Sequence, residues 1–110
     1  MRSFKCFSLG IVLLFPALLQ AGQIYGSVSS SGAGVGGAVI EISCGAVNTP
    51  GTTARDGSYR INVPPQGQCR LTLTGYAGAP SYIVFSYANP SQYDFELVRR
   101  PDGTYELRKR

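Results

Sequence analysis

The stretch 52–74 constrains the fold of this chain more than any other part of the sequence. Apolar and polar side chains alternate on both sides of a Pro-Pro-Gln-Gly corner, which is the period-2 pattern of strands with one buried face. Asp56 and Gly57 provide a tight turn before the first strand, because glycine takes a positive φ without steric cost. The prolines donate no ladder hydrogen bond, so they end that strand. The expected buried face carries Tyr59, Ile61, Val63, Cys69, Leu71 and Leu73.

Other segments repeat this alternation, and no segment shows a sustained helical period. The further strands are predicted at 23–29, 38–44, 81–87, 92–99 and 105–107, whereas 30–37 and 45–51 are expected to be connecting loops. Both faces of 81–87 are apolar, which favours a central strand or one that the C-terminal tail covers. The turn at 100–103 predicts a C-terminal antiparallel hairpin. This pattern is typical of an all-β sandwich of seven to eight strands.

The same residues resemble a known domain family. The spacing T-x-x-D-G-x-Y-x-I-x-V-P-x-x-G-x-C-x-L-x-L, preceded by I-x-G-x-V at 24–28 and G-A-x-I-x-I at 37–42, is similar to that of carboxypeptidase regulatory-like domains. The resemblance covers roughly 23–97 and implies a transthyretin-like (prealbumin-like) Greek-key β-sandwich. Cys69 stands where the family usually has an aromatic residue, which concerns the core more than the function.

Residues 1–21 have the pattern of a signal peptide. Arg2 and Lys5 precede an apolar run, and Leu19-Gln20-Ala21 ends in the small residue that a signal peptidase requires. The run is too short for the roughly 20 residues that span a bilayer, although an uncleaved anchor is the alternative. We therefore expect one domain at 22–110, in the periplasm or secreted, without a membrane span after cleavage.

The cysteines agree with export. Removal of Cys6 with the leader would leave Cys44 and Cys69, an even pair whose side chains both point toward the expected core. We predict a disulfide between them, since a domain of this size has a small core that benefits from a covalent link. A reactive dithiol is the alternative, which the absence of C-x-x-C spacing disfavours.

The composition argues against most kinds of catalysis, because several residue types that catalytic sites commonly use are missing. The chain has no histidine and no tryptophan, so the usual general base, the usual nitrogen ligand of metals and the best sugar-stacking residue are all missing. Gly32, Gly34 and Gly37 match G-x-G-x-x-G, but a strand pattern follows where a dinucleotide site needs a helix. Asp94 and Glu96 share a strand face and are expected to be solvated, with basic partners across the hairpin. We predict no enzyme activity, cofactor or metal site.

Tyrosines and arginines are the candidate binding residues of this chain. Tyrosine suits binding surfaces because it combines a rigid ring with a hydroxyl group. The basic excess is too small to indicate nucleic acid and is concentrated near the C-terminus, where it also protects edge strands from aggregation. The candidate surface residues are Tyr25, Tyr76, Tyr82, Arg99, Arg100 and Arg108. Packing within the sandwich is the alternative role for the three tyrosines.

The expected function is that of a non-catalytic exported module. The resemblance implies a structural or protein-interaction role, because in carboxypeptidases such a domain accompanies a catalytic domain. We expect a protein partner or self-association through an edge strand, at the first strand or at the final hairpin. A module that binds carbohydrate or cell-envelope glycan is the alternative. An enzyme that resembles the transthyretin-related hydroxyisourate hydrolases is a third, disfavoured hypothesis, since those enzymes use histidines that this chain lacks.

Overall fold

The computed structural model describes residues 22–64 and 67–110. The predicted leader, and Pro65 and Gln66 of the corner, lie outside the described residues. Every regular element within the described ranges is a strand, and no helix there could cross a bilayer. In chain order the strands are β1 (Gly22–Ser30), β2 (Ala33–Gly34), β3 (Val39–Cys44), β4 (Val47–Thr52), β5 (Ser58–Val63), β6 (Gly67–Thr74), β7 (Ser81–Ser86), β8 (Ser91–Arg99) and β9 (Tyr105–Lys109).

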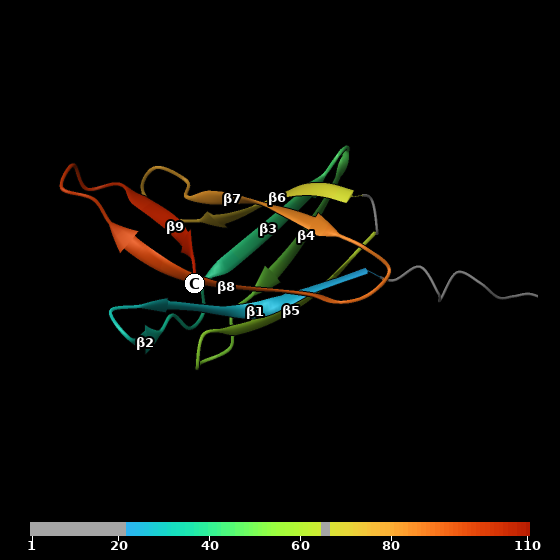
Figure 1. Ribbon diagram of the computed structural model, residues 1–110. Coiled ribbons are helices and arrows are strands. Elements are labelled where there is room, and N and C mark those ends of the chain that lie inside the picture. The colour runs from blue at the N-terminus through green and yellow to red at the C-terminus, as the bar shows by residue number, and fades with distance from the viewer. Residues whose placement is uncertain (1–21, 65–66) are drawn as a thin grey trace, which may run out of the picture.

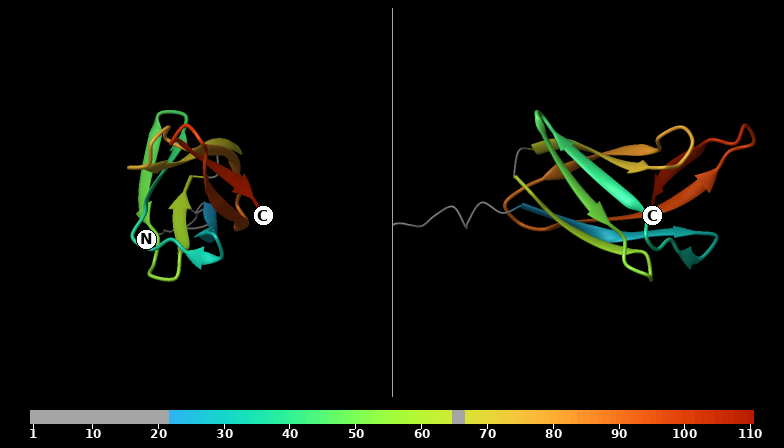
Figure 2. Two further views of the ribbon diagram at one scale, coloured as in Figure 1. Left: turned by 90° about the vertical axis from the view of Figure 1, so that its left-hand side faces the viewer. Right: turned by 180° about the vertical axis from the view of Figure 1, so that it is seen from behind.

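The strands form two sheets that face each other, which confirms the predicted all-β sandwich (Figures 1 and 2). The five-stranded sheet has the order β2-β1-β8-β9, and β5 also pairs with β1. The four-stranded sheet has the order β4-β3-β6-β7. The described residues contain nine strands rather than seven or eight, because part of each expected loop is a strand. Those parts are β2, which pairs with the end of β1, and β4, which pairs with β3 along its whole length.

The first strand lies inside its sheet. β1 pairs in parallel with β8 on one side, and antiparallel with β5 and then β2 on the other. Gly26 permits this arrangement, since a Cβ atom there would overlap the backbone carbonyl of Tyr93 in β8. The expectation of a free edge at the first strand is therefore wrong. The expected antiparallel hairpin of β8 and β9 is confirmed, and β9 forms one border of the sheet.

The core follows the predicted alternation. In β5 and β6 every second side chain is buried, and the same holds for β3 and the middle of β8. The fully buried large side chains come from both sheets and include Ile24, Val28, Ile40, Ile42, Leu71, Leu73, Val84 and Phe95. The chain passes from the five-stranded sheet to the four-stranded sheet between β5 and β6.

The turn before β5 forms as predicted. The Asp56 carboxylate accepts hydrogen bonds from the Ser58 backbone N–H at 3.0 Å and from the Ser58 hydroxyl at 2.7 Å. Gly57 has a φ of 91°, a conformation that side chains other than glycine rarely adopt. The two hydrogen bonds lower the pKa of the Asp56 carboxyl below its ordinary value. The local sequence thus fixes the start of β5.

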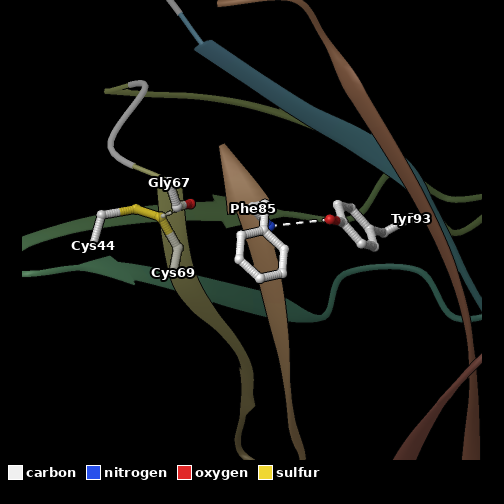
Figure 3. Close-up of a disulfide and its surroundings, with 5 residues drawn as sticks. All are labelled: Cys44, Gly67, Cys69, Phe85 and Tyr93. Carbon is white, nitrogen blue, oxygen red and sulfur yellow. Dashed lines mark hydrogen bonds between the residues drawn. A yellow bond between two sulfur atoms is a disulfide. The ribbon is translucent and has the colours of Figure 1, made fainter. Parts of the chain in front are cut away.

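The predicted disulfide is present between Cys44 and Cys69 (Figure 3). These residues lie opposite each other at one end of the β3–β6 ladder, with their Cα atoms 4.4 Å apart. Both are buried, with 1% and 3% of their surface exposed. The bond therefore links two neighbouring strands of one sheet and closes that end of the core.

Of the two expectations for the apolar strand at 81–87, the central position is wrong. β7 pairs with β6 on one side only and forms a border of the four-stranded sheet. Val84 and Ser86 are fully buried, whereas Phe85 and Tyr87 expose 38% and 56% of their surface. The low polarity of this segment therefore does not mark a central strand, since part of its apolar surface faces outward.

Candidate functional site

The two lateral sides of the sandwich, where the borders of the two sheets meet, are closed in different ways. On one side β4 lies against β5, and Gly51 of β4 approaches the side chain of Ile61 so closely that a Cβ atom would lie 2.5 Å from it. On the other side β7 faces β8 and β9, with no strand pairing between them in the described residues. Figure 1 shows the β8–β9 hairpin rising toward β7 at this side, where the Tyr105 N–H donates to the Ala77 carbonyl in the loop before β7. The candidate site lies here.

The border strands carry different protection against strand addition. Charged side chains and proline are the usual protection. Of the longer border strands, β4 contains Pro50, β5 contains Arg60, and β9 carries Glu106 and Arg108. β7, with the sequence SYIVFS, has neither a charge nor a proline. It is thus the border strand that the sequence leaves most open to a partner.

The backbone of β7 points alternately toward β6 and away from it. The Leu73 N–H donates to the Pro80 carbonyl at 3.0 Å, which fixes the register in which Tyr82, Val84 and Ser86 face the β6 backbone. The N–H and C=O groups of Ser81, Ile83 and Phe85 therefore point outward from the sheet. Such a row is the template to which an added strand can bind.

A tyrosine of the opposite sheet meets one of these outward groups. The Phe85 backbone N–H donates a hydrogen bond of 3.0 Å to the hydroxyl group of Tyr93 in β8 (Figure 3). Tyr93 is partly buried, and its ring stacks on that of Phe95 with centroids 6.2 Å apart. The Tyr93 side chain thus bridges the two layers at the open side and satisfies one donor of the free edge.

A groove runs beside this contact. It has a volume of about 540 Å³ and is lined by Arg70, Ser81, Tyr82, Ile83, Phe85, Tyr93 and Lys109. Its apolar part comes from β7 and Tyr93, and its polar part includes two cationic side chains from different sheets. The Arg70 guanidinium donates to the Ser81 hydroxyl at 2.9 Å, which holds it beside β7. No carboxylate is among these lining residues.

Phe85, which lines the groove, is stacked with Tyr87 just after β7. The rings of Phe85 and Tyr87 are nearly parallel, with an interplanar angle of 6° and centroids 6.2 Å apart. Both side chains are exposed, although large aromatic groups usually gain free energy from burial. An exposed pair of this kind is a candidate contact for a partner.

The tyrosines predicted for the surface lie in three separate places. Tyr82 packs against Phe95, with centroids 5.2 Å apart, and also lines the groove. Tyr76 packs edge-on against Tyr105 at 5.2 Å and so covers one end of the sandwich. Tyr25 lies under the Arg60 guanidinium, 5.1 Å from its ring centroid, at the opposite side. Only Tyr82 therefore belongs to the β7 groove.

The predicted arginines lie on the C-terminal hairpin, outside the groove. Arg100 and Arg108 both form ion pairs with Glu106, at 2.9 and 2.7 Å. These two partners lower the pKa of the Glu106 carboxyl below its ordinary value, with Arg108 as the larger cause. Arg99 is exposed at the end of β8. The predicted binding set is thus divided among several surfaces.

The basic partners predicted for Asp94 and Glu96 are not observed in the described part of the chain. Asp94 is partly buried and accepts hydrogen bonds from Ser27 at 3.1 Å and Gln92 at 3.0 Å. Glu96 lies opposite Arg108 in the ladder, but the Arg108 ion pair is with Glu106 on its own strand. Neither carboxylate forms an ion pair within 4.0 Å in the described part of the chain. Ser27 and Gln92 were missed because they are neutral.

The described residues offer no group of three or more metal-ligating side chains. The groove residues missed from sequence are Arg70, Ser81, Ile83, Phe85, Tyr93 and Lys109. For the three on β7 the signal was the absence of charge along 81–86, which by itself favoured a buried strand. Arg70, Tyr93 and Lys109 come from other strands, and only the tertiary structure brings them to the groove. The structure shows that the same absence marks an open border.

Comparison with known proteins defines the fold class. No family model matches the sequence, and no curated protein matches it. Among solved structures, the chain is similar to a DUF3823 family protein from Parabacteroides merdae ATCC 43184, with a TM-score of 0.56 and 11% sequence identity. The match covers 82% of this chain and 47% of that one, so the chain spans about half the length of its structural neighbour. At this identity the likeness shows a shared all-β sandwich fold alone.

Proposed function

We infer that this chain is a non-catalytic, exported β-sandwich module that binds a protein partner along β7. The observation that carries the proposal is the free border of β7, which combines outward backbone groups with exposed aromatic side chains and has no charge or proline of its own. Strand addition at such a border is a common mode of peptide recognition. The groove beside it gives side chains of a partner a place to pack.

Export is part of the same proposal. The buried disulfide is the type of bond that persists in the periplasm or outside the cell, where thiols are not kept reduced. Kinship with carboxypeptidase regulatory-like, transthyretin-like domains is also part of it, supported by the Asp-Gly turn before β5 and by the two stacked sheets. The module would then act as an interaction domain, without chemistry of its own.

Site-directed photocrosslinking in the cell envelope tests this function. A photoreactive amino acid at position 85 should give a covalent adduct with a partner protein, because that side chain is exposed at the free border. The same amino acid at position 55, in the exposed turn before β5, is the matched control and should not give that adduct. Equal labelling from the two positions, or none from position 85, would contradict the proposal.

A glycan-binding module is the second candidate function. The nearly parallel, exposed rings of Phe85 and Tyr87 favour it, since flat aromatic surfaces stack against sugar rings. In this case Phe85→Ala and Tyr87→Ala should each abolish retention on a polysaccharide column while the fold is kept. Absence of retention of the unchanged protein on cell-envelope polysaccharides removes this candidate.

A further inference from the structure

The charge of the β7 groove indicates the chemistry of its partner. Arg70 approaches the groove from the four-stranded sheet and Lys109 from the last strand of the other sheet. Arg70 uses one nitrogen to donate to Ser81, which leaves further N–H donors of the guanidinium for a ligand. Lys109 forms no ion pair within 4.0 Å in the described part of the chain. A segment that lies here thus meets two cations and no lining carboxylate.

The geometry of β7 indicates the conformation of that partner. Ser81, Ile83 and Phe85 present their backbone groups outward, and another extended chain can pair with these groups in a single ladder. Half-buried Ile83 and exposed Phe85 lie at alternate positions, so they would pack against alternate side chains of that chain. The partner is therefore an extended segment with apolar side chains between acidic ones.

One bond must change when such a segment binds. The Phe85 N–H donates to the Tyr93 hydroxyl, so an added strand that pairs with Phe85 takes over this donor. The Tyr93 side chain then turns away from Phe85, or its hydroxyl group bonds the new strand. In the unbound protein the same contact protects the border, in place of the missing charge or proline.

We propose that β7 and its groove bind an extended acidic peptide segment by strand addition, and that the Tyr93 hydroxyl is the group this segment displaces from Phe85. The proposal rests on the proposed function and specifies its ligand. Complementary charge selects the segment, while the backbone of β7 supplies the pairing that is independent of sequence.

Synthetic peptides test the charge preference. The probe is a peptide of about ten residues in which valine alternates with threonine and two positions carry glutamate. It should bind the disulfide-bonded protein about tenfold more tightly than the same peptide with lysine in place of glutamate, by fluorescence anisotropy at low salt. Combined Arg70→Gln and Lys109→Gln changes should remove this preference, whereas Arg55→Gln in the exposed turn should keep it. Equal binding of both peptides would overturn the acidic partner but leave strand addition, and thus the proposed function, intact.

Two changes test the pairing itself. Tyr93→Phe removes the acceptor that competes for the Phe85 N–H, so peptide affinity should rise about fivefold. Ile83→Pro removes an outward donor and no β6 ladder bond, so peptide binding should be lost. Should Ile83→Pro prevent folding, a peptide with N-methyl groups on alternate backbone nitrogens tests the same bonds on the unchanged protein. Unchanged affinity in Tyr93→Phe together with retained binding in Ile83→Pro would overturn strand addition.

Light scattering of the protein without peptide tests whether a second copy of the chain occupies β7. A monomer that binds the acidic peptide supports the proposal. A dimer that Ile83→Pro converts to a monomer would mean that a second copy occupies β7, and this would overturn the commitment to an acidic peptide. Loss of all peptide binding together with a position-85 crosslink to a partner would also overturn it, while the proposed function would stand.

Discussion

Tyr93 is the residue at which the core and the open border of the sandwich meet. Its hydroxyl accepts from the Phe85 N–H, its backbone carbonyl accepts from the Tyr59 hydroxyl at 2.6 Å, and its ring stacks on Phe95. The close approach of Gly26 to the same carbonyl adds a fourth contact. A single residue of β8 therefore connects β1, β5 and β7, which explains how the outer side of β7 is held although no strand pairs with it there.

Tyr59 should make the stability of the protein fall at alkaline pH. Burial raises the pKa of its hydroxyl well above the ordinary value of 10.0, with the charge of Asp94 as a second cause. Below pH 10 the hydroxyl is protonated in both the folded and the unfolded chain, so its full contribution is present. Above that pH the unfolded chain releases the proton while the folded chain keeps it, so the free energy of unfolding falls by about 1.4 kcal/mol per pH unit.

Urea denaturation of Tyr59→Phe measures this effect. At pH 7 the change removes one hydrogen bond to the Tyr93 carbonyl and should cost about 1 kcal/mol. The difference from the unchanged protein should shrink as the pH rises above 10, since the phenylalanine has no proton to release. A difference that stays constant up to pH 11 would show that the Tyr59 hydroxyl keeps an ordinary pKa.

Ser86 should tolerate the loss of its hydroxyl group. Its Oγ atom is buried without a hydrogen-bond partner among the described residues, and the residue has no exposed surface. Because an unpaired buried hydroxyl costs about 1–3 kcal/mol, Ser86→Ala should leave the free energy of unfolding unchanged or raise it by about 1 kcal/mol. Val84→Ala, two residues earlier on the same buried face, is the control and should lower it by roughly 2 kcal/mol. Equal losses in the two variants would contradict this.

At the scale of elements, the strands are held by different means. The β8–β9 hairpin has a turn in which Asp102 accepts from Thr104 N–H at 2.9 Å, and its exposed face has the Glu106 ion pairs. β3 and β6 are joined by the buried disulfide. β7 is held by its hydrogen-bond ladder with β6 and by the contact between Phe85 and Tyr93. The least protected element is thus the one to which we assign binding.

Removal of the disulfide should destabilise the fold substantially. Cys44 and Cys69 are 25 positions apart, and closing a loop of that length in the unfolded chain corresponds to about 3.5 kcal/mol on the chain-entropy estimate. Changing both residues to alanine should lower the free energy of unfolding by about this amount, as measured with urea. The unchanged protein under reducing conditions is the control and should behave similarly. A loss below about 1 kcal/mol in both would mean that the core holds these strands without the bond.

At the scale of the whole molecule, export and processing should produce a defined species. Expression of the complete sequence in a bacterium should yield a periplasmic or secreted protein whose intact mass matches residues 22–110 with one disulfide. Replacing Leu19 and Ala21 by bulky charged residues should block processing and give the mass of the full chain. A cytoplasmic product with free thiols would contradict the proposed location.

The fold class could be predicted from local patterns because burial in a strand has a period of two. The alternation in Tyr59, Ile61 and Val63 requires a sheet with one covered face, and it was observed as expected. The same reasoning placed Cys44 and Cys69 on the inner side, where they pair. The Asp56 turn follows from side-chain and backbone chemistry within three residues. Each of these features depends on neighbours in the sequence.

The pairing of strands, and with it the site, was decided only by the tertiary structure. Hydrogen bonds between strands join backbone groups that every residue carries, so side-chain patterns could not show that β1 lies inside its sheet or that β7 lies at a border. The contact of Tyr93 with Phe85 likewise depends on how the two layers meet at that side. The sequence by itself determined which faces are buried; the packing of the two sheets determined which edge remains free.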